Sequence, residues 1–394
     1  MNTEFVETAE RIGARLCRDA IWHSGRCNWT SDFLDGDSIA HGALGPDLYD
    51  GSSGIALFLW RLAEFTGERI FRLTACAALQ HALDHSEAGG GFYSGGVGVA
   101  YVACEILQSP QAAEALLRVE PDPARLDLLD GSAGAIAGLL TLYQQYTYAS
   151  LIDAATRHGD LLIAQASRSD EGWSWKTIEG SRNLTGFSHG TAGIAFALLE
   201  LYRASGENRF RAAALEAFRY EQTCFSAAEN NWPDFREAEP SYPAFWCHGA
   251  GGIAFSRLRA SQTLDDDALL REARVALDTT QAQTPHLANF SLCHGQAGNA
   301  DLFIYARDVL GEQHWLNTAE KIAQEGIERY ERRRIPWPTG LPGANETPDL
   351  MLGLAGIGYF YLRLDDPERA DPKRIPSILI PMARPVLRPT GDNP

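Results

Sequence analysis

One glycine motif recurs seven times, and its recurrence restricts what this chain can fold into. Each copy has the form G-x-x-G and leads directly into an apolar stretch. The copies begin at Gly51, Gly95, Gly131, Gly190, Gly249, Gly295 and Gly353. Neighbouring copies start 36 to 59 residues apart, which is the length of a helix pair with its loops. Because glycine allows a tight turn directly before a helix, the sequence predicts seven helix hairpins.

The apolar stretches differ from the segments between them in how hydrophobic residues are distributed. A stretch such as 190–202 is apolar nearly all round, which predicts a helix that is buried on most sides. A segment between motifs, such as 68–85, is apolar on one face only. This alternation favours an all-α fold, a seven-fold α/α toroid with about fourteen helices in two concentric layers. The alternative is an open solenoid, which would expose the apolar helices along one side.

The ring argument also determines the expected domain organisation. A chain of 394 residues would usually contain about two or three domains. A closed ring instead makes residues 1–394 a single domain. Residues 366–394 contain seven of the 19 prolines, so we expect an irregular C-terminal wrap there and no further domain.

Composition argues against several classes of partner. The formal net charge of −17 disfavours binding to nucleic acid or to an anionic membrane surface, because both attract clustered lysine and arginine. No apolar run approaches the roughly 18 residues of a membrane span. The first residues also lack the apolar core of a signal peptide. Seven cysteines, an odd number, favour reduced thiols and a cytoplasmic location.

The positions directly before the motifs carry the clearest chemical signal. Three of the ten histidines stand there, His189, His248 and His294. Cys247 and Cys293 precede the last two of them, and the resulting Cys-His-Gly triplets should meet on one rim of the ring. Thiolates and neutral imidazoles are the ligands that Zn²⁺ prefers, and three ligands with an open fourth position make a catalytic site. Buried cysteines with capping histidines are the alternative.

Three long loops, 168–188, 225–246 and 332–350, each lie just before a motif. By the repeat argument they should gather at the same end of the ring as the Cys-His-Gly triplets. They contain Trp173, Trp175, Trp232 and Trp337, and could form a lid or walls.

Two neighbouring motifs supply candidates for proton transfer. His189 could be a metal ligand or a general acid–base, because the imidazole pKa lies near neutrality. Asp127 and Asp130 stand one helical turn apart. Spacing alone does not tell which carboxylate faces the cavity and which caps the following helix.

With its seven glycine motifs, W-C-H-G at 246–249 and C-H-G-Q-A-G at 293–298, the chain resembles the lanthionine synthetase C-like family of lanthipeptide cyclases. The resemblance covers nearly the whole chain. It implies a seven-fold α/α toroid that holds Zn²⁺ through Cys247, Cys293 and His294. It further implies an acid–base role for His189 and an active-site role for Asp127, which leaves Asp130 as the helix cap.

The chain departs from one branch of this family. Stand-alone class I cyclases have R-x-x-W-C-Y-G, where this chain has Pro243 in place of the arginine and His248 in place of the tyrosine. His248 is therefore a further catalytic candidate. The pattern is more similar to the cyclase domain of bifunctional class II synthetases, without their dehydratase domain. The resemblance implies that a separate dehydratase prepares the substrate.

The resemblance implies an enzyme that adds cysteine thiols of a dehydrated precursor peptide to dehydroalanine or dehydrobutyrine. Zn²⁺ would activate the thiol, and His189, oriented by Asp127, would protonate the α-carbon. A transferase that adds glutathione or another small thiol to dehydrated residues is one alternative, and a non-catalytic peptide-binding scaffold is another. A glycosidase using Asp127 and Asp130 is a third, but it would give the rim cysteines no role.

Overall fold

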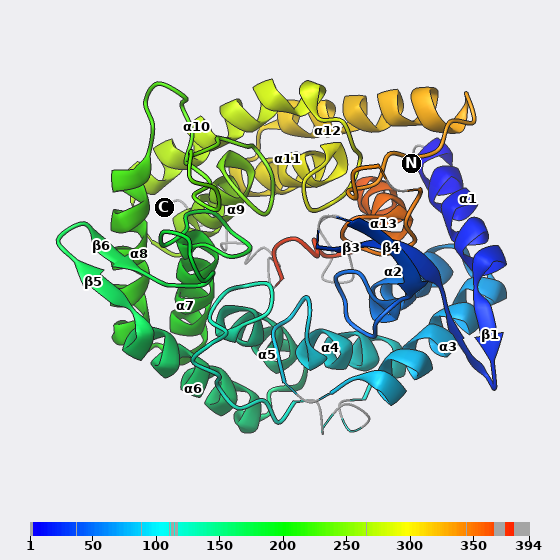
Figure 1. Ribbon diagram of the computed structural model, residues 1–394, viewed down its shortest axis with the longest axis horizontal. Coiled ribbons are helices and arrows are strands. Elements are labelled where there is room, and N and C mark those ends of the chain that lie inside the picture. Colours follow the sequence, from blue (N-terminus) through cyan, green and yellow to red (C-terminus); the bar gives the residue numbers. More distant parts are fainter. Residues whose placement is uncertain are drawn as a thin grey trace, which may run out of the picture.

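A ring of helices in two layers dominates the computed structural model, as Figure 1 shows. None of its described helices is long and apolar enough to cross a membrane. The structure describes residues 3–36, 38–87, 89–109, 111, 114, 117–264, 266–343, 345–365 and 375–381.

Seven helices form the inner layer, and each begins directly after the first glycine of a motif. They are α2 (Ser52–Thr66), α4 (Gly96–Leu107), α5 (Ser132–Tyr146), α7 (Thr191–Ser205), α9 (Ala250–Ser261), α11 (Gln296–Leu310) and α13 (Leu354–Leu364). Each inner helix packs against the next, and α13 packs against α2. The ring is therefore closed, which confirms the toroid and excludes the open solenoid.

Six helices form the outer layer. They are α1 (Thr3–Asp19), α3 (Arg69–His85), α6 (Ala149–Gln165), α8 (Asn208–Cys224), α10 (Asp267–Gln283) and α12 (Gln313–Gly326). Five of them pack on the inner helix that precedes them, whereas α1 packs on α13 and so joins the two ends of the chain. The described residues thus hold thirteen α-helices where about fourteen were expected. Between α4 and α5 none of the described residues belongs to an α-helix.

The remaining regular structure is short. One 3₁₀ turn (Thr284–His286) and one π-helical turn (Ile327–Glu331) follow α10 and α12. Three antiparallel hairpins, which the sequence analysis did not anticipate, are β1 (Ile21–His23) with β2 (Arg26–Asn28), β3 (Thr30–Asp35) with β4 (Ser38–Ala43), and β5 (Ser167–Ser169) with β6 (Gly172–Ser174). β1, β2, β5 and β6 have only three residues each, and no residue of the six-residue strand β4 is buried, so the sequence shows no clear alternating pattern there.

A closed cycle of backbone hydrogen bonds joins the seven motif loops. In every loop, the residue two positions before the motif donates its N–H to the carbonyl oxygen of the equivalent residue in the next loop, at 2.9 to 3.4 Å. The members in order are Tyr49, Tyr93, Leu129, Ser188, Cys247, Cys293 and Met351, and Met351 donates back to Tyr49. All seven inner helices therefore start at one end of the ring, as the repeat predicts. We call this end the rim.

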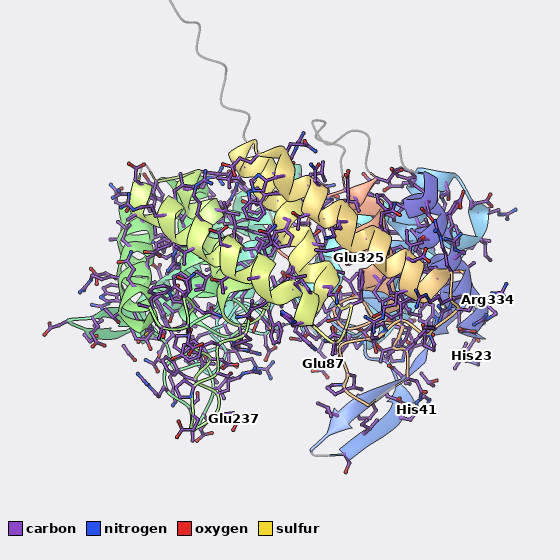
Figure 2. All side chains as sticks on the ribbon, turned by 90° about the horizontal axis from the view of Figure 1, so that it is seen from above. His23, His41, Glu87, Glu237, Glu325 and Arg334 are labelled. Carbon is purple, nitrogen blue, oxygen red and sulfur yellow. The ribbon has the colours of Figure 1, made fainter. Side chains whose placement is uncertain are left out.

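The three long loops attach to this rim. The Phe290 N–H bonds to Pro338 O in the third loop, and the Arg182 guanidinium in the first loop lies 4.1 Å from the Phe235 ring centre in the second. Figure 2 shows the loop that carries Glu237 and the β3–β4 hairpin that carries His41 projecting from the same side of the ring. The loop tryptophans Trp175, Trp232 and Trp337 are buried and so anchor the loops.

The described part of the expected C-terminal wrap, 375–381, runs through the middle of the ring instead of around its outside (Figure 1). The Tyr93 hydroxyl donates to Ile378 O and the Trp246 indole N–H to Leu379 O, each at 2.8 Å. The rest of the wrap lies outside the described residues. Because Tyr93 and Trp246 belong to the motif loops, this segment packs under the rim.

We expect Leu379→Ala to lower the free energy of unfolding by about 2–5 kcal/mol, because it removes a buried core side chain. Leu379 is 0% exposed. Urea unfolding followed by circular dichroism measures the change. The matched control is Leu73→Ala in α3, where the side chain is 48% exposed and the expected change is within about 0.5 kcal/mol. Equal effects of the two substitutions would show that 375–381 is not part of the core.

Candidate functional site

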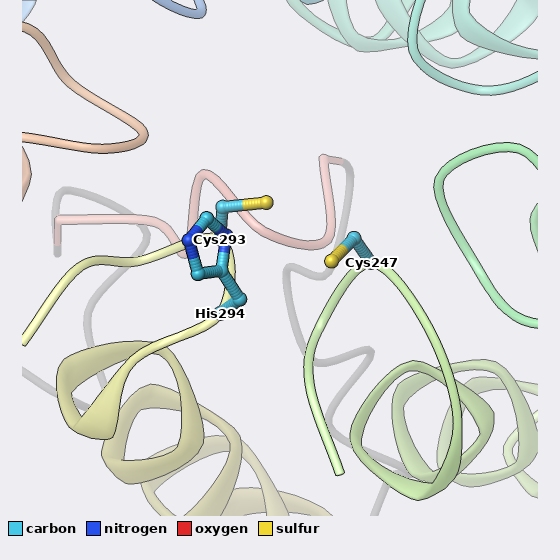
Figure 3. Close-up of side chains that lie close together, drawn as sticks. All are labelled: Cys247, Cys293 and His294. Atoms are coloured by element: carbon cyan, nitrogen blue, oxygen red, sulfur yellow. The ribbon is translucent and has the colours of Figure 1, made fainter. Parts of the chain in front are cut away.

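Cys247, Cys293 and His294 come together on the rim. One potential ligand atom from each lies within 4.8 Å of the others. Figure 3 shows the two cysteine side chains approaching each other from separate loops. The backbone cycle explains the approach, because Cys247 and Cys293 occupy equivalent positions in neighbouring loops, and the Cys247 N–H donates to Cys293 O at 3.4 Å. No second group of this kind occurs in the described part of the chain.

The hydrogen bonding of His294 suits a metal ligand. Its Nε2 lies 2.8 Å from Gly340 O, and since a carbonyl oxygen only accepts, Nε2 must carry the proton. Nδ1 is then the nitrogen with a free lone pair. Metal-binding histidines commonly donate their other N–H in this way. A side chain at 340 would not fit, because its Cβ would lie 3.0 Å from the His294 ring.

The electrostatics of the cysteines also fit a cation. The neighbouring Cys293 thiol, followed by burial, raises the pKa of Cys247. A divalent cation held between the sulfurs would reverse this shift, because it stabilises thiolates. The two sulfurs and one imidazole are the donor set of a zinc site with an open position.

Tyr49 is a site residue that the sequence analysis missed. Its hydroxyl donates to Cys293 Sγ at 2.9 Å. Tyr49 holds the same place in the first motif loop that Cys247 and Cys293 hold in theirs, two residues before the first glycine. Comparing the residues at this position of each motif loop would therefore have identified Tyr49.

His189 and Asp127 form a hydrogen-bonded pair on the same rim. His189 Nδ1 lies 2.7 Å from Asp127 Oδ2, and since a carboxylate accepts, Nδ1 carries a proton and Nε2 is left free. The His189 side chain is 25% exposed, so Nε2 can be reached. The other oxygen of Asp127 accepts the Asp130 N–H at 2.8 Å, which holds the carboxylate in place.

The expectation that Asp130 caps the following helix is wrong. The N-cap of α5 is Gly131, and it has no side-chain cap hydrogen bond. Asp130 instead bonds with Arg125 at 3.2 Å. The physical reason is that the motif turn satisfies the first helical N–H groups with backbone oxygens of the loop, as the Ser132 N–H bond to Arg125 O shows.

His248 lies beside the His189–Asp127 pair, with 6.0 Å between the two imidazole centres. It is 1% exposed, and its Nδ1 is 3.8 Å from Asp234 Oδ2. Burial, followed by the charge of Arg236, lowers the pKa of His248 to about 3. His248 is therefore neutral near pH 7 and holds no proton in excess.

A carboxylate–guanidinium pair in loop 225–246 completes the site, and the sequence analysis missed this pair too. Asp234 Oδ2 accepts from Arg236 Nε at 2.9 Å and from Nη2 at 2.7 Å. Asp234 also lies against His248, next to Cys247. The sequence does contain one indication of this pair, because Arg236 is the only basic residue of the loop.

The family model described as lanthionine synthetase C-like protein matches residues 42–380. This span contains every site residue described above. Among curated proteins, the chain is 24% identical over 376 residues to the lacticin 481/lactococcin biosynthesis protein LcnDR2 of Lactococcus lactis subsp. lactis. That match covers 85% of this chain but only 38% of LcnDR2.

Two further relatives are described by different activities. The glutathione S-transferase LANCL1 of Danio rerio is 24% identical over 355 residues, which is 82% of this chain and 83% of that protein. The nisin biosynthesis protein NisC of Lactococcus lactis subsp. lactis is 22% identical over 236 residues, or 53% and 56% of the two chains.

Solved structures share the fold. Nisin cyclase superposes with a TM-score of 0.64 at 17% identity, over 80% of this chain and 88% of that one. A GH76 alpha-mannanase of Bacteroides thetaiotaomicron superposes with a TM-score of 0.54 at 12% identity, over 91% and 95%. The toroid thus recurs in proteins with unrelated names, so function has to be argued from the site.

Proposed function

This chain belongs to the lanthionine synthetase C-like family, and on that premise we propose that it is a zinc-dependent lanthipeptide cyclase. It would add cysteine thiols of a dehydrated precursor peptide to dehydroalanine or dehydrobutyrine and so form thioether rings. The observation that carries the proposal is that the Cys247, Cys293 and His294 cluster and the His189–Asp127 pair share one rim.

Zinc is the metal that the donor set supports. Cys247, Cys293 and His294 Nδ1 would hold it, with the Gly340 carbonyl orienting the imidazole. The Tyr49 hydroxyl bond to Cys293 Sγ would limit the negative charge that this sulfur places on the metal. When bound, zinc would lower the pKa of a substrate cysteine thiol and so supply thiolate at neutral pH.

His189 would serve as the general acid. Asp127 fixes its imidazole through Nδ1, which directs Nε2 away from the carboxylate. Nε2 would first take up the proton that the substrate thiol releases, and after the thiolate adds to the β-carbon this proton would pass from Nε2 to the α-carbon. His248 would stay neutral and act through packing and orientation, since it is almost fully buried.

The partners follow from the reaction. The substrate must arrive already dehydrated, so we propose that a separate dehydratase acts first. A cytoplasmic setting suits the chemistry, because both the ligand thiols and the substrate thiol have to be reduced.

A transferase that adds a free thiol to dehydrated residues is the second candidate. It is favoured by the match to LANCL1, named a glutathione S-transferase, which covers most of both chains. The same site would serve, because an open rim can admit a small thiol in place of a peptide cysteine.

One competition experiment separates the two. The protein is incubated with a peptide that carries one cysteine and one dehydroalanine, together with glutathione, and the products are analysed by mass spectrometry after alkylation of free thiols. A cyclase yields an unchanged mass that resists alkylation, whereas a transferase yields the mass of one added glutathione. The control peptide has alanine in place of cysteine and can yield only the adduct. If neither product exceeds the rate without protein, both candidates are wrong.

A further inference from the structure

We propose that Arg236 is a further catalytic residue of this site, and that its guanidinium donates hydrogen bonds to the acyl oxygen of the dehydro residue under attack. This inference rests on the proposed function. It names the group that stabilises negative charge in the transition state, a role that no other residue described above fills.

The first support is how firmly Arg236 is held. Both oxygens of Asp234 accept from the Arg236 Nε, at 2.9 and 3.1 Å, and Oδ2 also accepts from Nη2 at 2.7 Å. The Arg236 backbone N–H bonds to Asp234 Oδ1 at 3.1 Å as well. Such a bidentate pair fixes the plane and direction of the guanidinium. The Asp234 side chain is 6% exposed, so this anchor is itself packed in place.

The second support is that the Arg236 guanidinium keeps N–H donors that Asp234 does not use. The Arg236 side chain is 45% exposed, and its Nη1 makes no hydrogen bond to any of the described residues. A guanidinium has five N–H donors, and Asp234 leaves several of them unused. Arg236 can therefore bind a substrate oxygen without losing its anchor.

The third support is its position. Asp234 Oδ2 is 3.8 Å from Nδ1 of His248, which directly follows Cys247. The His248 ring in turn lies 6.0 Å from the His189 ring. Through His248, the pair is thus linked to both the cysteine cluster and the proposed proton donor. Figure 2 shows the adjacent Glu237 on the loop that projects from this side of the ring.

The electrostatics agree with this position. Burial lowers the pKa of the Arg236 guanidinium, but the hydrogen bonds and charge of Asp234 and the charges of Cys247 and Cys293 outweigh burial and raise the pKa overall. The guanidinium therefore keeps its positive charge at this position.

The chemistry explains why a cation is needed. The thiolate sulfur forms a bond to the β-carbon, and the alkene electron pair moves onto the acyl oxygen as an enolate. The pair then returns as the α-carbon takes a proton, so the proton lost by the thiol equals the proton gained at carbon. The negative charge that develops on the acyl oxygen would lie near the carboxylates of Asp127 and Asp234. These carboxylates would repel that charge. A prearranged donor aimed at such an oxyanion contributes roughly 10²–10³-fold in rate.

The test uses Arg236→Gln, Arg236→Lys and Arg236→Ala, with Arg125→Gln as matched control. Arg125 is a rim arginine that also bonds to a carboxylate, Asp130, and is 54% exposed. We expect Arg236→Gln to lower kcat by roughly 10²–10³-fold, with zinc content, Tm and binding of an unreactive cysteine-free peptide unchanged. Arg236→Lys should retain part of the rate, and guanidinium ions added to Arg236→Ala should restore part of it. Arg125→Gln should stay near the wild-type rate.

Several results would overturn the inference. If Arg236→Gln keeps the wild-type kcat, Arg236 has no catalytic role. A rate loss that follows the loss of zinc or peptide binding, or that guanidinium does not relieve, would show that the Asp234–Arg236 pair only supports the loop. Failure of the wild-type protein itself to close rings is a different result, since it would contradict the proposed function and with it the role of Arg236.

Discussion

Cys293→Ala should leave a folded toroid that has lost its metal and its ring-closing activity. The fold should survive because Cys293 takes part in the backbone cycle through its N–H and carbonyl groups, which alanine also has. The metal should be lost because two ligands remain where three are needed for a catalytic zinc site. The loss of affinity should exceed the roughly 10–100-fold that removing an outer partner of a ligand costs.

Zinc content after dialysis, measured by atomic emission, and turnover of a dehydrated peptide report the two losses. The matched control is Cys104→Ala. Cys104 is likewise a buried free cysteine, but it lies within the inner helix α4, outside the metal cluster. We expect this variant to keep one zinc ion per chain and wild-type turnover. Full zinc content in Cys293→Ala would contradict the ligand assignment.

His189→Asn should separate proton transfer from metal binding. Its Nδ1 bonds to Asp127, and His189 does not belong to the cluster of potential ligands. We therefore expect full zinc content and a rate of ring closure that falls by about 10²–10⁴-fold, the usual contribution of a general acid–base. Single-turnover kinetics on a peptide with one ring, alongside the zinc assay, would measure both quantities.

Two carboxylate variants provide a matched pair for this prediction. Asp127→Asn removes the charge that orients His189 and should slow ring closure, whereas Asp130→Asn alters a carboxylate that bonds with Arg125 and should have little effect. If His189→Asn loses zinc as readily as Cys293→Ala, then His189 is a ligand. If it cyclises at the wild-type rate, another rim group donates the proton.

The glycine-motif repeat explains why the toroid and the approach of the two cysteines could be predicted from the sequence. Seven motifs in one register place equivalent residues at equivalent points of a ring, so the toroid, its single rim and the approach of Cys247 to Cys293 all follow from spacing. The same register would have pointed to Tyr49, which stands at the cysteine position of the first loop.

Features outside the repeat could not be predicted in this way. Segment 375–381 is apolar enough to be buried, but its composition does not tell whether it lies inside or outside the ring. The β1–β2 and β5–β6 hairpins are too short for a visible alternation, and β4 buries none of its side chains. In loop 225–246, Asp234 and Arg236 are close neighbours in the sequence, but no local pattern indicates the contact of Asp234 with His248.

The sequence by itself determined the closed ring with seven inner helices and which residues open each of them, because local turn chemistry and hydrophobic periodicity act over a few residues and repeat. Only the tertiary structure decided which partner each of these side chains meets. His189 and Asp127 are 62 positions apart, and Tyr49 and Cys293 are 244 apart. Contacts over such separations depend on how the loops pack against the closed rim, and no local pattern encodes that packing.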